Sequence, residues 1–230
     1  MSRALAPLCA LLLLLLAAPV GAAPLSAVLG RAVAYTTGVE AVPKWKRLLD
    51  RLAREWPRYE ACLARAGACP SDRARAWRDL LRRLGDRSRA AQVAAVDRFA
   101  NAFPYRTDAE IWGRSDYWAT PFEFLTRSGD CEDYAIFKYV SLRLLGVPAR
   151  DMRLIVLQDT RRDVPHAVLE VRVDGRDLLL DNLAPRPRPV EAVRRYYHPY
   201  YAASTLDVHF PGRADGRLTL LRADRLRPAR

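Results

Sequence analysis

Residues 128–135 read Ser128-Gly129-Asp130-Cys131-Glu132-Asp133-Tyr134-Ala135 and begin a predicted helix that ends at the turn Gly146-Val147-Pro148. Asp130 suits the N-cap position, and Asp133 follows three residues later, as in an acidic capping box. Cys131 therefore lies in the first helical turn. There the positive end of the helix dipole lowers the pKa of a thiol and favours the nucleophilic thiolate. The segment predicts a helix that presents a reactive cysteine at its N-terminus.

The carboxylates beside this cysteine act in the opposite direction. Asp130 and Glu132 raise the pKa of the thiol unless a cation neutralises them. The cluster of Asp130, Glu132 and Asp133 offers the oxygen ligands that calcium prefers. Two interpretations stay open on these residues alone: a calcium site, or acids that only cap the helix.

Three short apolar runs follow the helix and predict strands at Met152–Leu157, Ala167–Val173 and Leu178–Leu180. Asp174-Gly175 separates the last two runs and is a hairpin turn signal. Before the helix, tryptophans and leucines recur at helical spacing over residues 45–84, which predicts buried helical faces. A further helix is predicted over residues 90–103. The aromatic segment after it, residues 104–121, is predicted to be a loop.

Helices first, and then a central helix packed on antiparallel strands, predict an α+β fold. No repeat and no long linker divides the chain. We therefore expect a single domain over residues 23–230, with a helical N-terminal part over 23–100 and a catalytic core over 101–205.

The predicted hairpin places a base beside an orienting carboxylate. With a two-residue turn, Val173 pairs with Arg176, and Val168 lies opposite Asp181. His166 is then a diagonal neighbour of Asp181 on the same face, within reach of two polar side chains. A nucleophilic cysteine needs such a base, although a lone histidine at a strand start is more often structural. We interpret the other two histidines as surface or packing residues: His198 and His209.

The first residues predict export. Arg3 precedes an apolar run that contains six consecutive leucines, Leu11–Leu16, and the small residues Val20-Gly21-Ala22-Ala23 follow. This pattern is typical of a secretory signal peptide, here residues 1–22. The apolar run is too short to cross about 30 Å of hydrocarbon, and no later segment comes close. We expect an exported protein with no membrane span in the mature chain.

Composition and cysteine usage narrow the remaining classes. The 230 residues are 50% hydrophobic, which excludes fibrous and wholly disordered chains. The net charge of +12 favours acidic partners, but no compact basic block with interleaved aromatics predicts a nucleic-acid partner. Cys9 leaves with the signal peptide, and Cys62 and Cys69 are spaced to close a small disulfide loop. Cys131 remains as the unpaired thiol.

Several motifs, taken in order, resemble the bacterial transglutaminase-like cysteine peptidases. The resemblance covers roughly residues 45–205 and is carried by Tyr117-Trp118-Ala119-Thr120-Pro121-Phe122-Glu123-Phe124-Leu125, Gly129-Asp130-Cys131-Glu132-Asp133-Tyr134-Ala135-Ile136, Lys138-Tyr139, Met152-Arg153-Leu154, His166-Ala167-Val168-Leu169 and Leu179-Leu180-Asp181-Asn182. One departure precedes the cysteine, because Thr126-Arg127-Ser128 stands where a further glycine is expected.

The resemblance implies a papain-like fold in its transglutaminase variant. It implies that Cys131 is the nucleophile, that His166 acts as base and then acid, and that Asp181 orients the imidazole. The family's calcium dependence would fall on Asp130, Glu132 and Asp133.

The resemblance also implies a biological setting. Its nearest member type is a periplasmic protease that cuts a small-residue site near the N-terminus of a large, acidic surface adhesin. Such a protease is restrained by the periplasmic domain of an inner-membrane receptor for cyclic diguanylate. Two alternatives remain: acyl transfer to an amine by a transglutaminase of the same fold, or a non-catalytic, calcium-dependent binding module. The complete set Cys131, His166 and Asp181 argues against the module.

Overall fold

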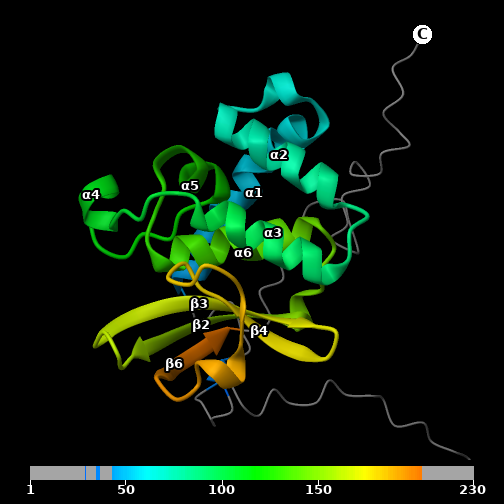
Figure 1. Ribbon diagram of the computed structural model, residues 1–230. Coiled ribbons are helices and arrows are strands. Elements are labelled where there is room, and N and C mark those ends of the chain that lie inside the picture. The colour runs from blue at the N-terminus through cyan, green and yellow to red at the C-terminus, as the bar shows by residue number, and fades with distance from the viewer. Residues whose placement is uncertain (1–28, 30–34, 37–42, 204–230) are drawn as a thin grey trace, which may run out of the picture.

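The structure, a computed structural model, describes residues 29, 35–36 and 43–203 (Figure 1). The predicted signal peptide, Cys9 and His209 lie outside these residues. Within them, helices gather on one side of a six-stranded sheet (Figure 1). The predicted α+β fold class is confirmed. None of the helices in the described part of the chain combines the length and the apolar character that a membrane span needs.

The helical layer follows the predicted stripes and adds two short helices. The α-helices of the described residues are α1 (Pro43–Ala64), α2 (Asp72–Leu84), α3 (Arg89–Asn101), α4 (Asp108–Trp112), α5 (Pro121–Arg127) and α6 (Cys131–Leu144). Trp45, Trp56 and Trp77 are buried, as their spacing predicted. The interpretation of the aromatic segment as a loop is wrong for α4 and α5. Each begins at a threonine N-cap with a glutamate three residues later, and this capping box satisfies the free N–H groups of its first turn.

The sheet has the order β1-β6-β2-β3-β4-β5. The three predicted strands are β2 (Met152–Asp159), β3 (Val164–Val173) and β4 (Arg176–Leu180), and their pairing is antiparallel. The sequence did not indicate the remaining strands, which are β1 (Tyr35–Thr36), β5 (Arg188–Pro189) and β6 (Tyr197–Ala203). β1 pairs in parallel with β6, and so a segment before the helices also belongs to the sheet.

The two faces of the sheet bury separate apolar clusters. Leu154 and Leu169 face the helices and join the larger core. Ile155 and Val168, one residue along each strand, belong to a smaller cluster on the opposite face. Val190, Val193 and Tyr196, from the segment between β5 and β6, belong to the same cluster and cover this second face. The sheet is therefore covered on both sides near the strands that carry His166 and Asp181.

α6 is the central helix of the molecule. Every residue from Asp133 to Leu144 is buried, which is why the helix shows no amphipathic stripe. Lys138 lies in this buried stretch, and its Nζ forms an ion pair with Asp97 Oδ1 of α3 at 2.8 Å. A helix enclosed on all sides holds its first turn in a fixed position, and that turn contains Cys131.

The cysteines are arranged as their spacing indicated. Cys62 of α1 and Cys69 form a disulfide between residues seven positions apart, ahead of α2. Cys131 is the free cysteine of the described residues. The disulfide joins the end of α1 to the segment before α2, whereas the free thiol lies at the boundary between helices and sheet.

Candidate active site

The chain enters α6 through a tightly constrained segment. Ser128 has φ 67° and ψ −160°, a backbone region that is normally reserved for glycine. Gly129 packs so closely on Asp133 that an added Cβ would lie 2.2 Å from Asp133 Oδ2. Asp130 is the N-cap, and Cys131 is the first helical residue. The departure noted at residues 126–128 therefore falls on a position where serine is strained.

The thiol of Cys131 is partly buried and faces both negative charge and the sheet. Its Sγ donates to Glu132 Oε2 at 3.2 Å. Burial raises the pKa of the Cys131 thiol, and the carboxylates of Glu132 and Asp130 raise it further. The backbone N–H of Ala167 donates to the sulfur and acts in the opposite direction. Because Ala167 directly follows His166, this contact places the sulfur beside the start of β3.

His166 and Asp181 form a buried pair on the hairpin. The register expected from the two-residue turn is present, with Val173 opposite Arg176. The side chains meet as that register predicted: His166 Nε2 lies 3.0 Å from Asp181 Oδ1. The two side chains are 5% and 1% exposed. Because Nε2 faces Asp181, Nδ1 is the ring nitrogen left to accept another proton.

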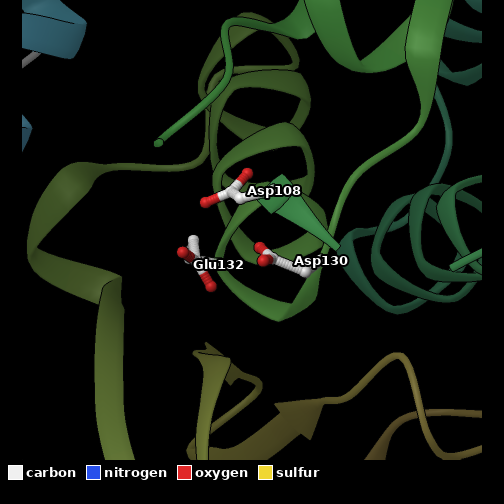
Figure 2. A group of neighbouring side chains, drawn as sticks. All are labelled: Asp108, Asp130 and Glu132. Atoms are coloured by element: carbon white, nitrogen blue, oxygen red, sulfur yellow. The ribbon is translucent and has the colours of Figure 1, made fainter. Parts of the chain in front are cut away.

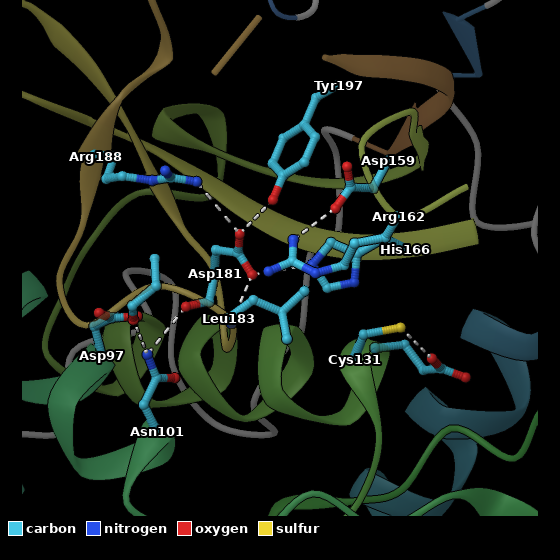
Figure 3. Close-up of polar contacts among 12 residues, drawn as sticks. Asp97, Asn101, Cys131, Asp159, Arg162, His166, Asp181, Leu183, Arg188 and Tyr197 are labelled. Atoms are coloured by element: carbon cyan, nitrogen blue, oxygen red, sulfur yellow. Dashed lines mark hydrogen bonds and ion pairs between the residues drawn. The ribbon is translucent and has the colours of Figure 1, made fainter. Parts of the chain in front are cut away.

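Asp181 receives hydrogen bonds on both carboxylate oxygens (Figure 3). Besides the contact with His166, Oδ1 accepts the Leu183 N–H at 2.8 Å, and Oδ2 accepts the Tyr197 hydroxyl at 2.6 Å. The Arg188 guanidinium lies 3.8 Å from Oδ2. Burial alone would raise the pKa of Asp181, but the contacts with His166 and Tyr197 outweigh it and lower the pKa to about 2. Asp181 is therefore ionised at neutral pH.

The helical layer also fixes the backbone at Asp181. Asn101, the last residue of α3, donates from Nδ2 to the carbonyl oxygens of Asp181 and Ala184, each at 3.0 Å (Figure 3). These two bonds join the loop after β4 to the helices. The carboxylate is thus placed by contacts from both layers of the fold.

A group of three acids lies at the start of α6, where Glu132 accepts the hydrogen bond from the Cys131 thiol. Carboxylate oxygens of Asp108, Asp130 and Glu132 all lie within 4.8 Å of one another. The predicted residues Asp130 and Glu132 belong to this group. Asp108 comes from the start of α4 and was not predicted. Figure 2 shows the three side chains converging at the first turn of α6.

The environment of this acidic group is unfavourable without a cation. Burial raises the pKa of Asp130 to about 8, and Glu132 adds to the effect. Burial likewise raises the pKa of Asp108 to about 6. Asp108 Oδ1 and Asp130 Oδ1 are buried and have no hydrogen-bond partner among the described residues. Unpartnered carboxylate oxygens this close together are the ligands that a calcium ion takes, so these residues fit such an ion.

Asp133, the third predicted metal ligand, is not part of this group in the structure. Its Oδ1 accepts the Ala119 N–H at 2.6 Å, and its Oδ2 faces the Asp130 N–H at 3.4 Å. The contact with Ala119 holds the start of α6 against the segment before α5, and the contact with Asp130 caps the helix itself. Asp133 thus closes the capping box that the sequence indicated. In the acidic group, Asp108 takes the place in which we expected Asp133.

Two residues of the site escaped the sequence analysis. Asp108 had a local signal, since it follows Thr107 in a capping box, but only the fold brings α4 to α6. The second is Tyr197, whose hydroxyl donates to Asp181 Oδ2. Its specific bond to Asp181 depends on the pairing of β6 with β2, which the sequence did not indicate. His198, by contrast, is exposed, as expected.

Comparison with known proteins identifies the family. Residues 56–202 match the family described as bacterial transglutaminase-like cysteine proteinase. No curated protein matches the chain in sequence. The matched residues include the start of α6, the hairpin and Tyr197, which are the parts that form the site.

Solved structures of LapG from Legionella pneumophila are similar to this chain. The calcium-bound form is 34% identical with a TM-score of 0.52, over 58% of this chain and 75% of that chain. The EGTA-treated form is 30% identical with a TM-score of 0.52, over 68% of this chain and 82% of that chain. The similarity confirms the expected transglutaminase-like fold and the assignment as a cysteine peptidase. The chain therefore belongs to the bacterial transglutaminase-like cysteine proteinases.

Proposed function

We propose that the protein is an exported cysteine endopeptidase in which Cys131, His166 and Asp181 form the catalytic triad. The observation that carries the proposal is the buried contact of 3.0 Å between His166 Nε2 and Asp181 Oδ1, next to a thiol on a helix N-terminus. Asp181 keeps the Nε2 proton on the ring, and Nδ1 then accepts the proton of the Cys131 thiol.

The reaction follows from these positions. The Cys131 thiolate attacks the scissile carbonyl carbon and forms a tetrahedral intermediate. His166 returns the proton to the leaving amine, the C–N bond breaks, and a thioester remains on Cys131. Water, deprotonated by His166, then attacks the thioester and releases the acid and the thiol. Asp181 stabilises the imidazolium that forms in each half of the reaction.

The proposal includes calcium dependence, with Asp108, Asp130 and Glu132 as the ligands. A bound calcium ion would supply positive charge beside Cys131. Two observations support this: the unpartnered buried oxygens of Asp108 and Asp130, and the thiol's hydrogen bond to Glu132. In the absence of such charge, burial and then the carboxylates raise the pKa of the thiol and favour its protonated form. The similar Legionella protein has been solved in a calcium-bound form.

For the substrate, we propose a small-residue site near the N-terminus of a large, acidic surface adhesin, cut in the periplasm to control biofilm attachment. The periplasmic domain of an inner-membrane receptor for cyclic diguanylate would restrain the enzyme. The family assignment supports this setting, and the net charge of +12 suits an acidic substrate.

Incubation with a recombinant N-terminal adhesin fragment tests the proposal. The purified chain lacking residues 1–22 is mixed with the fragment in calcium or in EGTA, and products are identified by mass spectrometry. We expect a single cut in calcium and little or none in EGTA. A parallel sample with a primary amine separates hydrolysis from acyl transfer, because transfer adds the mass of the amine to the new carboxyl end. Equal cutting by Cys131→Ala, or no cut in any sample, would contradict the proposal.

A further inference from the structure

Tyr197 makes a contact with the proposed triad that the reaction scheme does not use. Its hydroxyl donates to Asp181 Oδ2 at 2.6 Å, on the carboxylate oxygen that His166 does not contact (Figure 3). The side chain of Tyr197 is fully buried. A phenol that donates to a buried carboxylate forms a charge-assisted hydrogen bond, which is shorter and stronger than a neutral one.

The position of this hydroxyl is set by strand pairing and ring packing. Tyr197 begins β6 and pairs with Asp159 at the end of β2. Its ring packs edge-on against Tyr196, with centroids 5.0 Å apart, and lies 6.1 Å from the imidazole of His166. The hydroxyl therefore reaches Asp181 from a strand that carries neither His166 nor Asp181.

We propose that Tyr197 is a positioning residue for the cysteine peptidase reaction, because it fixes the Asp181 carboxylate so that Oδ1 faces His166 Nε2. This inference rests on the proposed triad. A carboxylate turns freely about its Cβ–Cγ bond unless both oxygens are held. The Leu183 N–H holds Oδ1, and the Tyr197 hydroxyl holds Oδ2 at a much shorter distance than Arg188 does.

The direction of the hydrogen bond is fixed as well. Burial and the neighbouring Asp181 raise the pKa of the Tyr197 hydroxyl, so the phenol keeps its proton and acts only as a donor. Asp181 in turn stays ionised and acts only as an acceptor. The imidazole then has one stable orientation, with Nδ1 available to the Cys131 thiol.

Alkylation of Cys131 by iodoacetamide tests this without knowledge of the substrate. The thiolate displaces iodide, and the rate reports how well His166 takes the thiol proton. All proteins are measured in the same calcium concentration. We expect Tyr197→Phe, which removes one oxygen atom, to slow alkylation about tenfold while the fold is retained. Tyr196→Phe is the matched control, since it removes a hydroxyl from the adjacent buried tyrosine, and we expect it to leave the rate unchanged.

A double-mutant cycle separates positioning from a structural effect. If Tyr197 acts through Asp181, then Tyr197→Phe has no further effect on the rate in an Asp181→Ala protein. The same fractional loss in both backgrounds, or an unchanged rate for Tyr197→Phe alone, would overturn the inference. Failure of the proposed triad gives a different result, because His166→Ala and Asp181→Ala would then leave alkylation at the wild-type rate.

Discussion

The proposed site has carboxylates on two sides, in different surroundings. One side is Asp181, which contacts His166. The other is the acidic group of Asp108, Asp130 and Glu132, which contacts Cys131 through Glu132. Asp181 has hydrogen-bond donors on both oxygens, and its pKa is lowered to about 2. Asp130 and Asp108 each have a buried oxygen without a partner, and burial raises their pKa values to about 8 and about 6. The chain supplies every contact that Asp181 needs. In the acidic group, the charges of Arg114 and Lys44 act on Asp108 but do not outweigh burial, and its pKa stays raised.

The two sides of the site therefore differ in what they require. The Asp181 side is complete within the fold and requires only that the chain folds. The acidic side, by the proposal above, also requires a cation. Asp130 and Glu132 are adjacent to Cys131 in sequence, so a cation bound there would act directly on the nucleophile. Under that proposal, His166 and Asp181 are in place without the ion, whereas the reactivity of Cys131 depends on it. The predictions below alter one side at a time.

The largest effect is expected from removing the base on the complete side. His166→Ala should lower peptidase activity at least about a thousandfold, since nucleophile and base act as one unit. Added calcium should not restore the activity, because the ion acts on the other side of the site. Activity is measured as cleavage of the adhesin fragment. His198→Ala is the control, as His198 is exposed on β6. A variant of His166 that keeps a tenth of the activity would show that the base is another residue.

The second effect concerns the acidic group and decides between the ligand set expected from the sequence and the one proposed from the structure. Asp108→Asn removes one charge from the acidic group and should weaken calcium binding about a hundredfold. Asp133→Asn should change calcium affinity far less, because its carboxylate is already engaged with the Ala119 N–H. Calorimetric titration with calcium measures both. If Asp133→Asn instead shows the larger loss, the ligand set predicted from sequence is correct and Asp108 is a bystander.

The elements of this fold were predictable to different degrees. The helix that carries Cys131 and the hairpin that carries His166 and Asp181 follow from local patterns, because turn chemistry fixes the register between Val173 and Arg176. Asp108 and Tyr197 reach the site from α4 and β6 through long-range pairing. No local pattern encodes such pairing. For the same reason, the sequence indicated Asp133, which is adjacent to Glu132, as the third acid of the group, whereas the structure places Asp108 there.

The third prediction uses pH to compare the two sides. The pKa of Asp181 falls from about 3.9 in the unfolded chain to about 2 in the folded protein. Its contribution to the free energy of unfolding is therefore fully present above about pH 5 and is lost progressively as the pH falls toward 2. The size is roughly 2 to 3 kcal/mol.

Thermal unfolding over this acidic range checks the effect. Asp181→Asn should lack this part of the slope while it keeps the rest of the acid denaturation. The raised pKa values of Asp108 and Asp130 have the opposite sign, because ionisation of those groups costs stability as the pH rises. Parallel curves for the wild type and Asp181→Asn would show that the surrounding donors do not stabilise the ionised carboxylate.

The smallest effect is expected at Ser128, in the segment that leads to Cys131 between the two sides. Ser128 adopts φ 67° and ψ −160°, which strains a residue that has a Cβ. Ser128→Gly should relieve the strain and raise the free energy of unfolding by about 1 kcal/mol, after the greater entropy of glycine in the unfolded chain is subtracted. Ser128→Ala keeps the Cβ and serves as the control, with no expected gain. Chemical denaturation measures both variants. Because neither carboxylate set is altered, peptidase activity in calcium should stay at the wild-type level. A loss of activity in the more stable glycine variant would mean that the strain itself positions Cys131 between base and acids.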